Sequence, residues 1–194
     1  MRKINEIFYS LQGEGFHTGT PAVFIRFSGC NLRCPFCDTN HVPFTEMTPE
    51  EVVEEVKRYP ARHVVITGGE PSLQLTEELV EELQVAGKFV AVETNGTHRL
   101  PRTVDWVTLS PKDAFVGEAA ARPVLPYCDE LKVVFTGEPL PDYGHIEATH
   151  RFLQPCDTGD AARNREIVQG AVQYCLEHPA WRLSLQTHKV LDIR

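Results

Sequence analysis

Three of the six cysteines in this 194-residue chain, Cys30, Cys34 and Cys37, stand close together with the spacing C-x3-C-x2-C. Three thiolates on one short loop can hold three positions of a metal centre and leave the fourth open to a small molecule, as catalysis requires. Two centres suit this spacing: an iron–sulfur cluster held by three cysteines, or a zinc ion with His41 as its fourth ligand. A non-catalytic zinc-binding module is therefore an alternative to the enzyme hypothesis.

Length and charge limit the other possibilities. A chain of 194 residues can bury one well-filled core, so a single domain over residues 1–194 is expected. The net charge of −8 offers no broad basic field to a nucleic acid, and a small-molecule partner is expected instead. The first residues lack the apolar run of a secretion signal, and no stretch approaches the roughly twenty apolar residues of a membrane span. We therefore expect a cytoplasmic protein, no membrane, and cysteines present as thiols or metal ligands.

The chain alternates strand-like and helix-like segments, which predicts an α/β fold with a largely parallel sheet. The predicted strands are 22–28, 63–67, 88–94, 104–109, 130–135 and 151–154. The predicted helices are 48–59, a segment that carries Leu75, Leu79, Val80 and Leu83 and stops at Gly87, and 164–177. Ligands of such folds lie beyond the carboxyl ends of the strands, and the unusual polar groups of this sequence collect at those ends.

Several of these groups admit both a structural and a functional interpretation. Arg26 interrupts an apolar strand, so it either leaves at the strand edge or binds an anion there. Gly68 and Gly69 end a strand ahead of a helix, where a loop can approach a ligand closely. The glycine-rich residues 11–19 are either a surface turn or a close approach to another group. Glu70 and Glu93 either support the backbone of their motifs or bind an amine.

Six segments in the same order resemble one enzyme family. GCNLRCPFCDT is similar to the cluster loop of radical S-adenosylmethionine enzymes, and TGGEP after a strand is similar to their methionine-binding motif. More narrowly, the chain resembles the 7-carboxy-7-deazaguanine synthase family. The segments are SLQGEGFHTGTPAVFIRFSGCNLRCPFCDTN, ITGGEPSLQ, VETNGT, LSPK, FLQPCD and SLQTHKVLDIR. A small radical-activating enzyme for a glycyl-radical partner would share the cluster loop, but it would not need QGEG, Arg26 or the QTHK tail.

The resemblance implies a partial parallel (β/α) barrel of about six strands with reduced helical decoration. It also implies a homodimer and an electron donor such as flavodoxin. The implied reaction converts 6-carboxy-5,6,7,8-tetrahydropterin to 7-carboxy-7-deazaguanine with loss of ammonia, in queuosine and deazapurine biosynthesis. A [4Fe–4S] cluster and S-adenosylmethionine would carry the chemistry, so no protein side chain is expected to be catalytic.

The resemblance also implies roles for individual residues. Cys30, Cys34 and Cys37 would hold the cluster, and Thr39 would help to hold Mg2+. The residues implied to bind the substrate are Leu11, Gln12, Gly13, Glu14, Arg26, Thr67, Gln186, His188 and Arg194, the last through its terminal carboxylate. The residues implied to contact S-adenosylmethionine are Phe36, Cys37, Asp38, Gly69, Ser110, Pro111, Lys112, Gln154, Pro155, Cys156 and Asp157. Arg26 would bind the substrate carboxylate through both arms of its guanidinium.

Overall fold

A single curved sheet organises the computed structural model, which describes residues 1–37, 39–40, 42–117 and 121–194. Within these residues the strand order is β3-β1-β2-β4-β5-β6-β7-β8-β9. The strands are β1 (Arg2–Leu11), β2 (Pro21–Phe27), β3 (Thr45–Met47), β4 (His63–Gly68), β5 (Phe89–Thr94), β6 (Trp106–Leu109), β7 (Tyr127–Phe135), β8 (Glu147–Pro155) and β9 (Trp181–Leu183). From β2 to β9 every neighbouring pair is parallel, whereas β1 pairs antiparallel with both β2 and β3.

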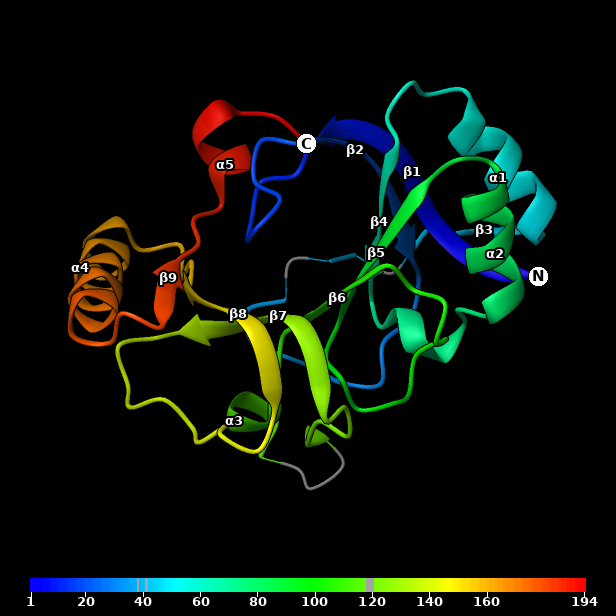
Figure 1. Ribbon diagram of the computed structural model, residues 1–194. Coiled ribbons are helices and arrows are strands. Elements are labelled where there is room, and N and C mark those ends of the chain that lie inside the picture. The colour runs from blue at the N-terminus through cyan, green and yellow to red at the C-terminus, as the bar shows by residue number, and fades with distance from the viewer. Residues whose placement is uncertain (38, 41, 118–120) are drawn as a thin grey trace.

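The helices are α1 (Pro49–Lys57), α2 (Glu77–Val85), α3 (Asp113–Val116), α4 (Ala161–Glu177) and α5 (Thr187–Leu191), with a 3-10 turn, η1, at Pro71–Leu73. Three of them, α1, α2 and α4, cover the outer face of the sheet (Figure 1). α1 and α2 pack together beside β1 and β5, and α4 packs against β8 and β9 at the other end. None of the described helices combines the length and the apolar character needed to cross a bilayer.

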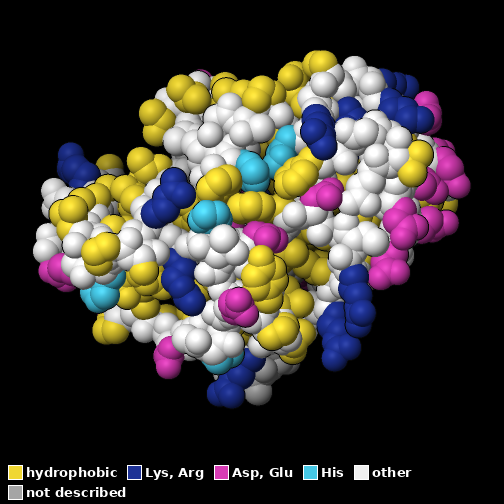
Figure 2. All heavy atoms as spheres, viewed as in Figure 1, with side chains coloured by type: hydrophobic (Ala, Val, Ile, Leu, Met, Phe, Trp, Pro, Cys, Tyr) yellow, Lys and Arg dark blue, Asp and Glu magenta, His cyan; other side chains and the backbone are white. Residues whose placement is uncertain are grey.

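The start of α1 follows directly from its sequence. Thr48 accepts a hydrogen bond from the Glu51 amide at 3.3 Å, and the Glu51 carboxylate accepts one from the Thr48 amide at 2.8 Å. This reciprocal capping satisfies two amides that lack helical partners. Val52 and Val56 then face the core. The opposite faces of α1 and α2 are acidic, and Figure 2 shows these side chains gathered over the two helices.

The predicted parallel α/β fold is confirmed, and the structure adds β1, β3, β9 and the short helices α3 and α5. Six predicted strands are present, and β9 adds a short seventh to the parallel series. The strand β1 was missed because residues 5–19 were interpreted from their glycines, and a register shift between Ile4 and Glu6 interrupts the alternation that reveals a strand. The helix expected from residue 164 begins three residues earlier, because Asp160 caps it by accepting from the amides of Ala162 and Arg163.

Aromatic rings and histidines fill the inner face at the amino ends of the parallel strands. His63 opens β4 with 7% of its surface exposed, and its ring stacks on Phe89 at 5.2 Å between centroids. The ring of His17 lies 4.6 Å from that of His63 and 5.8 Å from that of Phe89. Burial, together with the neighbouring His17, lowers the pKa of His63 to about 4. His63 is therefore neutral at physiological pH in the folded chain.

This burial predicts a loss of stability in mild acid. Between pH 6.5 and about 4 the unfolded chain binds a proton at His63 that the folded chain does not, so the free energy of unfolding falls as the pH falls. The full shift is worth about 3 kcal/mol. His63→Phe should make urea unfolding of the metal-free protein less sensitive to pH across this window. His145→Phe, at an exposed loop position, should keep the wild-type slope, and equal slopes in all three proteins would contradict the prediction.

Candidate active site

Strand alternation brings polar side chains together on the inner face of the sheet. On β2, β4 and β5 the residues Val23, Ile25, Val64, Ile66, Val90 and Val92 point to the helices and form one apolar cluster. Their neighbours in sequence point the other way, because successive side chains of a strand alternate between faces. Arg26, Thr67 and Glu93 therefore face one interior at the carboxyl ends of their strands. Lys132 faces the same interior from the middle of β7, because its neighbours Leu131 and Val133 point to a second apolar cluster.

The cysteine loop is fixed to the turn that follows β4 by main-chain hydrogen bonds. The Gly69 amide donates to the Phe27 carbonyl at 2.9 Å, and the Glu70 amide donates to the Gly29 carbonyl at 2.9 Å. A Cβ atom on Gly69 would collide with the carbonyl of Gly29, the residue before Cys30. Glycine is thus required at position 69 for the two backbones to approach this closely.

Glu70 stabilises the same turn after β4 through hydrogen bonds of its carboxylate. It is 1% exposed, and its carboxylate accepts from the Ser72 amide at 3.0 Å, the Thr94 hydroxyl at 2.6 Å and the Asn95 amide at 2.8 Å. Asn95 in turn donates to the side chain of Asn31, inside the cysteine loop, at 3.1 Å. Of the two interpretations left open for Glu70, these contacts favour support of the backbone.

The three cysteines of the loop line one end of a cavity of about 410 Å3. Among the residues expected to contact S-adenosylmethionine, those that line this cavity are Phe36, Cys37, Gly69, Ser110, Lys112, Gln154, Pro155, Cys156 and Asp157. Pro111 is buried and is not part of the lining, and Asp38 lies outside the described residues. Gln154 is 6% exposed, and neither polar atom of its amide has a hydrogen-bond partner among the described residues.

The cysteines are free thiols, as expected for a reduced chain. Burial raises the pKa of both Cys30 and Cys34, so metal binding at these thiols must release protons. His41, the fourth ligand of the zinc hypothesis, lies outside the described residues. Among the residues described, no three His, Cys, Asp or Glu side chains are close enough together to bind a single metal ion.

A second cavity, of about 510 Å3, adjoins the first. All nine residues expected to bind the substrate line it: Leu11, Gln12, Gly13, Glu14, Arg26, Thr67, Gln186, His188 and Arg194. Glu14, Thr39, Thr67, Gly68, Glu93 and Gln186 line both cavities. These shared residues form the boundary where a molecule in one cavity would meet a molecule in the other.

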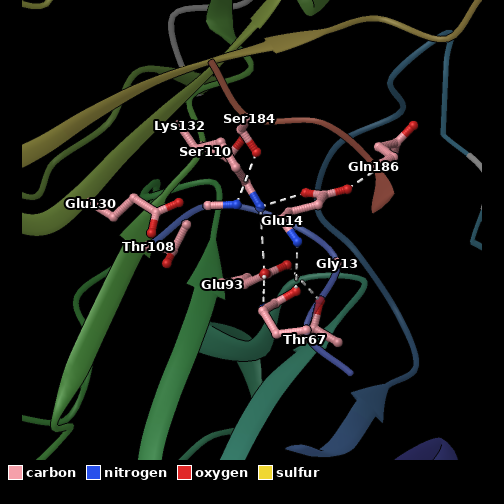
Figure 3. A network of polar contacts seen from close by, with 12 residues as sticks. Gly13, Glu14, Thr67, Glu93, Thr108, Ser110, Glu130, Lys132, Ser184 and Gln186 are labelled. Carbon is pink, nitrogen blue, oxygen red and sulfur yellow. Dashed lines mark hydrogen bonds and ion pairs between the residues drawn. The ribbon is translucent and has the colours of Figure 1, made fainter. Parts of the chain in front are cut away.

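A buried ion-pair network holds this boundary (Figure 3). The Lys132 ammonium lies 2.6 Å from Glu14 Oε2 and 3.4 Å from Glu93 Oε1. Burial by itself would lower the pKa of Lys132, but the two carboxylates outweigh it and the net shift is upward. Burial would likewise raise the pKa of Glu14, but Lys132 outweighs it and the pKa is lowered. Lys132 and Glu14 are therefore both charged at neutral pH.

Two further ionisable groups lie beside the network, the half-buried Lys112 and the buried Glu130. Lys112 donates to the Ser110 carbonyl at 2.7 Å and to its hydroxyl at 2.6 Å, and burial lowers the pKa of Lys112 to about 8. Glu130, 2% exposed, accepts from the Phe16 amide at 3.0 Å, and burial raises its pKa. Both face the interior of the sheet together with Lys132.

Arg26 is paired with Glu6, a partner that the sequence did not suggest. Its Nε donates to Glu6 Oε1 at 2.9 Å, from the register position opposite Glu6 on β1. The other Glu6 oxygen pairs with the guanidinium of Arg194, which lies 4.8 Å from the centre of the Phe8 ring. Arg194 thus lines the cavity, and its main-chain oxygen accepts from the Ser10 hydroxyl at 2.6 Å.

The C-terminal segment crosses from β9 to the β1–β2 end of the sheet (Figure 1). Gln186 donates to Glu14 Oε1 at 2.9 Å, and both the amide and the hydroxyl of Thr187 donate to the Gly13 carbonyl. Lys189 pairs with Asp157 at 2.6 Å, on the side of the cysteines. The segment therefore binds the rims of both cavities.

Glu6, Glu130 and Lys132 were not predicted as substrate or cofactor residues, and for Glu93 the sequence left open backbone support or the binding of an amine. Glu130 and Lys132 carry a detectable signal, because they are charges at alternate positions of a strand whose other positions, Leu131 and Val133, are apolar. The same reasoning drew attention to Arg26 from the sequence. Glu6 carries no such signal, since β1 itself was missed.

Comparison with known proteins identifies the family. The Radical SAM superfamily model matches residues 24–113. A 7-carboxy-7-deazaguanine synthase from Bacteroides thetaiotaomicron is 54% identical over 194 residues, which are the whole of both chains. This chain belongs to the 7-carboxy-7-deazaguanine synthase family. A 7-carboxy-7-deazaguanine synthase from Nitratidesulfovibrio vulgaris is 42% identical and covers 98% of each chain.

A solved structure agrees with this assignment. The crystal structure of QueE from Escherichia coli is similar with a TM-score of 0.73 and 30% identity, covering 95% of this chain and 93% of that one. Members of the radical SAM superfamily use S-adenosylmethionine and an iron–sulfur cluster. Full-length membership of the synthase family decides against the zinc module and against an activating enzyme for a glycyl-radical partner.

The contact between Gly69 and Gly29 predicts a specific loss of cluster binding. Gly69→Ala should force the turn after β4 away from the start of the cysteine loop, because its Cβ would meet backbone and not a mobile side chain. After anaerobic reconstitution we expect iron content to fall to less than about half of the wild-type value, since a displaced ligand loop weakens a metal site. Gly144→Ala, whose Cβ would meet only the side chain of Asp142, should bind iron normally. Wild-type iron content in Gly69→Ala would contradict the prediction.

Proposed function

We propose that this chain converts 6-carboxy-5,6,7,8-tetrahydropterin to 7-carboxy-7-deazaguanine and ammonia, a step of queuosine and deazapurine biosynthesis. The reaction balances without an external oxidant, because product and ammonia together contain all the atoms of the substrate. S-adenosylmethionine can therefore be regenerated in each turnover. Relatives named 7-carboxy-7-deazaguanine synthase over full length support this proposal.

The observation that carries the proposal is the pair of adjoining cavities. One is lined by three cysteines, and the other contains an arginine suited to a carboxylate, with Glu14 and Glu93 at the boundary. Two reactants held on either side of such a boundary would meet at close range in a fixed orientation. Fixing reactants in this way removes much of the entropic cost of reaction.

The residues present fit the expected cofactors. Cys30, Cys34 and Cys37 supply three soft ligands, which suit an iron–sulfur cluster that keeps one iron position for another ligand. Gln154 contributes a buried amide without a partner among the described residues, as a hydrogen-bonding site for a ligand would. When bound, the [4Fe–4S] cluster and S-adenosylmethionine supply the radical that removes a hydrogen atom from the substrate.

The side chains of the second cavity would bind and orient the pterin. Arg26, held at Nε by Glu6, would bind the substrate carboxylate with its terminal N–H groups. Glu14, ionised beside Lys132, would accept N–H hydrogen bonds from the ring. His188 packs closely on Gly13 and, with Gln186, would help to close the cavity against water and other hydrogen donors.

We also propose a Mg2+ ion at Thr39, which lines both cavities. One hydroxyl is a weak ligand, so the substrate carboxylate and water would complete the coordination. Thr39→Ala should raise the Mg2+ concentration needed for half-maximal activity by about tenfold, whereas Thr39→Ser should keep the wild-type value. Identical Mg2+ requirements in all three proteins would rule out this site.

The remaining features of the proposal concern the whole protein. We propose a single domain that forms a homodimer in the cytoplasm, takes electrons from a donor such as flavodoxin, and binds neither nucleic acid nor membranes. The acidic faces of α1 and α2 are consistent with the lack of a nucleic-acid partner. Light scattering of the reconstituted enzyme would test the dimer.

An anaerobic assay tests the reaction and the site together. The reconstituted chain, given reductant, S-adenosylmethionine, Mg2+ and 6-carboxytetrahydropterin, should form 7-carboxy-7-deazaguanine detectable by mass spectrometry. Cys34→Ala should abolish the product because it removes a cluster ligand. Arg26→Ala should lower kcat/KM by about 100-fold or more, since a charged hydrogen bond to the substrate is lost, while still binding the cluster.

Other outcomes would locate the error. If the wild-type protein forms 5′-deoxyadenosine but leaves the pterin unchanged, the superfamily chemistry holds and the proposed substrate is wrong. If Arg26→Ala retains full kcat/KM, Arg26 does not bind the carboxylate. Arg58→Ala, at an exposed position after α1, provides the matched control and should have wild-type activity.

A further inference from the structure

Lys132 lines the first cavity, beside its boundary with the second, and the family resemblance gives it no role. Its side chain is 6% exposed, and it contacts both Glu14 and Glu93, which face both cavities. A buried ammonium is costly unless counter-charges stabilise it. Here the two counter-charges are themselves cavity residues, so the position of Lys132 determines theirs (Figure 3).

The carboxylates are held at every oxygen. Glu14 receives Lys132 at Oε2 and Gln186 at Oε1, at 2.6 and 2.9 Å. Glu93 receives Gln12 at Oε1, at 3.1 Å, and Thr67 at Oε2, at 3.4 Å, in addition to Lys132. Because each oxygen already has a donor, the orientation of both groups is fixed before any ligand binds. Each carboxylate oxygen can still accept a further hydrogen bond from the cavity.

Two neighbouring carboxylates in a buried site do not both stay ionised without a cation, since like charges disfavour each other. For Glu14, burial favours the protonated acid, and Lys132 reverses that preference. The charged or titratable groups that face Glu14 from the packed elements are Lys132 and Glu130 on β7, Glu93 on β5, Lys112 after β6 and His188 on α5. Lys132 is the one that donates directly to it.

We propose that Lys132 is a positioning residue that keeps Glu14 ionised and correctly oriented to recognise the amino-pyrimidinone edge of the pterin. This inference rests on the proposed function. On that edge a ring N–H and an exocyclic amino group point the same way, which suits the two oxygens of a carboxylate. A protonated Glu14 would offer an O–H where the ring requires an acceptor.

Kinetics of Lys132→Met across pH test the proposal. Without Lys132, Glu14 should be protonated at neutral pH and should lose its charged hydrogen bond to the pterin. We therefore expect the KM for 6-carboxytetrahydropterin to rise by about 10- to 100-fold, with a smaller change in kcat. The KM should recover as the pH is raised, since alkali restores the ionised Glu14. Lys132→Arg should retain the wild-type pH profile. Lys57→Met, which removes an exposed lysine on α1, is the matched control and should behave as wild type.

A double variant separates positioning from general stability. In Glu14→Gln the carboxylate is absent, so adding Lys132→Met should change KM by less than about twofold. The double variant can also be measured if Lys132→Met alone does not fold. It lacks one of the two carboxylates that the loss of Lys132 leaves without a cation. Calorimetric binding of 7-carboxy-7-deazaguanine to the metal-free chain gives a readout independent of turnover. It should show the same pH-dependent weakening in Lys132→Met.

The outcomes are distinguishable from failure of the proposed function. A wild-type enzyme that makes no 7-carboxy-7-deazaguanine overturns the function itself. An active wild type with an unshifted pH profile in Lys132→Met overturns the inference about Lys132. So does a double variant in which the effects of Glu14→Gln and Lys132→Met on KM simply multiply, since independent residues behave in that way.

Discussion

The close approach of two main chains at Gly69 is the constraint on which the rest of the site depends. The turn after β4 bonds through its amides to the carbonyls of Phe27 and Gly29, immediately before the cysteine loop. Because the contact is between backbones, no side-chain adjustment can replace it. The cysteines and the strand-end residues of the larger sheet therefore share one rigid frame. The supporting bonds of Glu70 and Asn95 extend that frame to β5.

Electrostatic balance is the second requirement of this interior. The inner face carries Glu14, Glu93 and Glu130 against Lys112 and Lys132, all of them buried or half-buried. In such a region a charge is tolerated only when it is paired, so each group constrains its neighbours. Fixed dipoles and charges of this kind need little rearrangement when a reaction occurs, which is the physical basis of preorganised active sites.

The last residues of the chain complete a site that the sheet alone leaves open. Gln186 and Thr187 bind the glycine-rich β1–β2 loop, Lys189 binds Asp157, and Arg194 pairs with Glu6. These contacts join segments that are far apart in sequence. They connect the chain after β9 to β1, although these two strands do not pair with each other. Part of the second cavity thus depends on interactions between segments that only the folded sheet brings together.

The sequence alone determined the class of the fold and the chemistry of the loops. Local signals determined the structure of the nearby main chain. They are the capping residue Thr48, the apolar runs at 63–67 and 88–94, and the glycines at strand ends. The cysteine spacing and the six resembling segments likewise indicated the family and nine of the residues that line the second cavity. The local sequence pattern was sufficient to predict the structure wherever residues close together in sequence determine it.

Only the tertiary structure decided which charges pair. Glu6 and Arg26 meet because β1 pairs with β2 across a register shift, and that shift concealed β1 from sequence analysis. Lys132 meets Glu14 across 118 residues, and the boundary between the cavities needs β5, β7, the β1–β2 loop and the C-terminal segment together. The curvature of the sheet and the faces of its strands determine which distant charges come into contact. A buried charge is stable only beside an opposite charge that the fold places there.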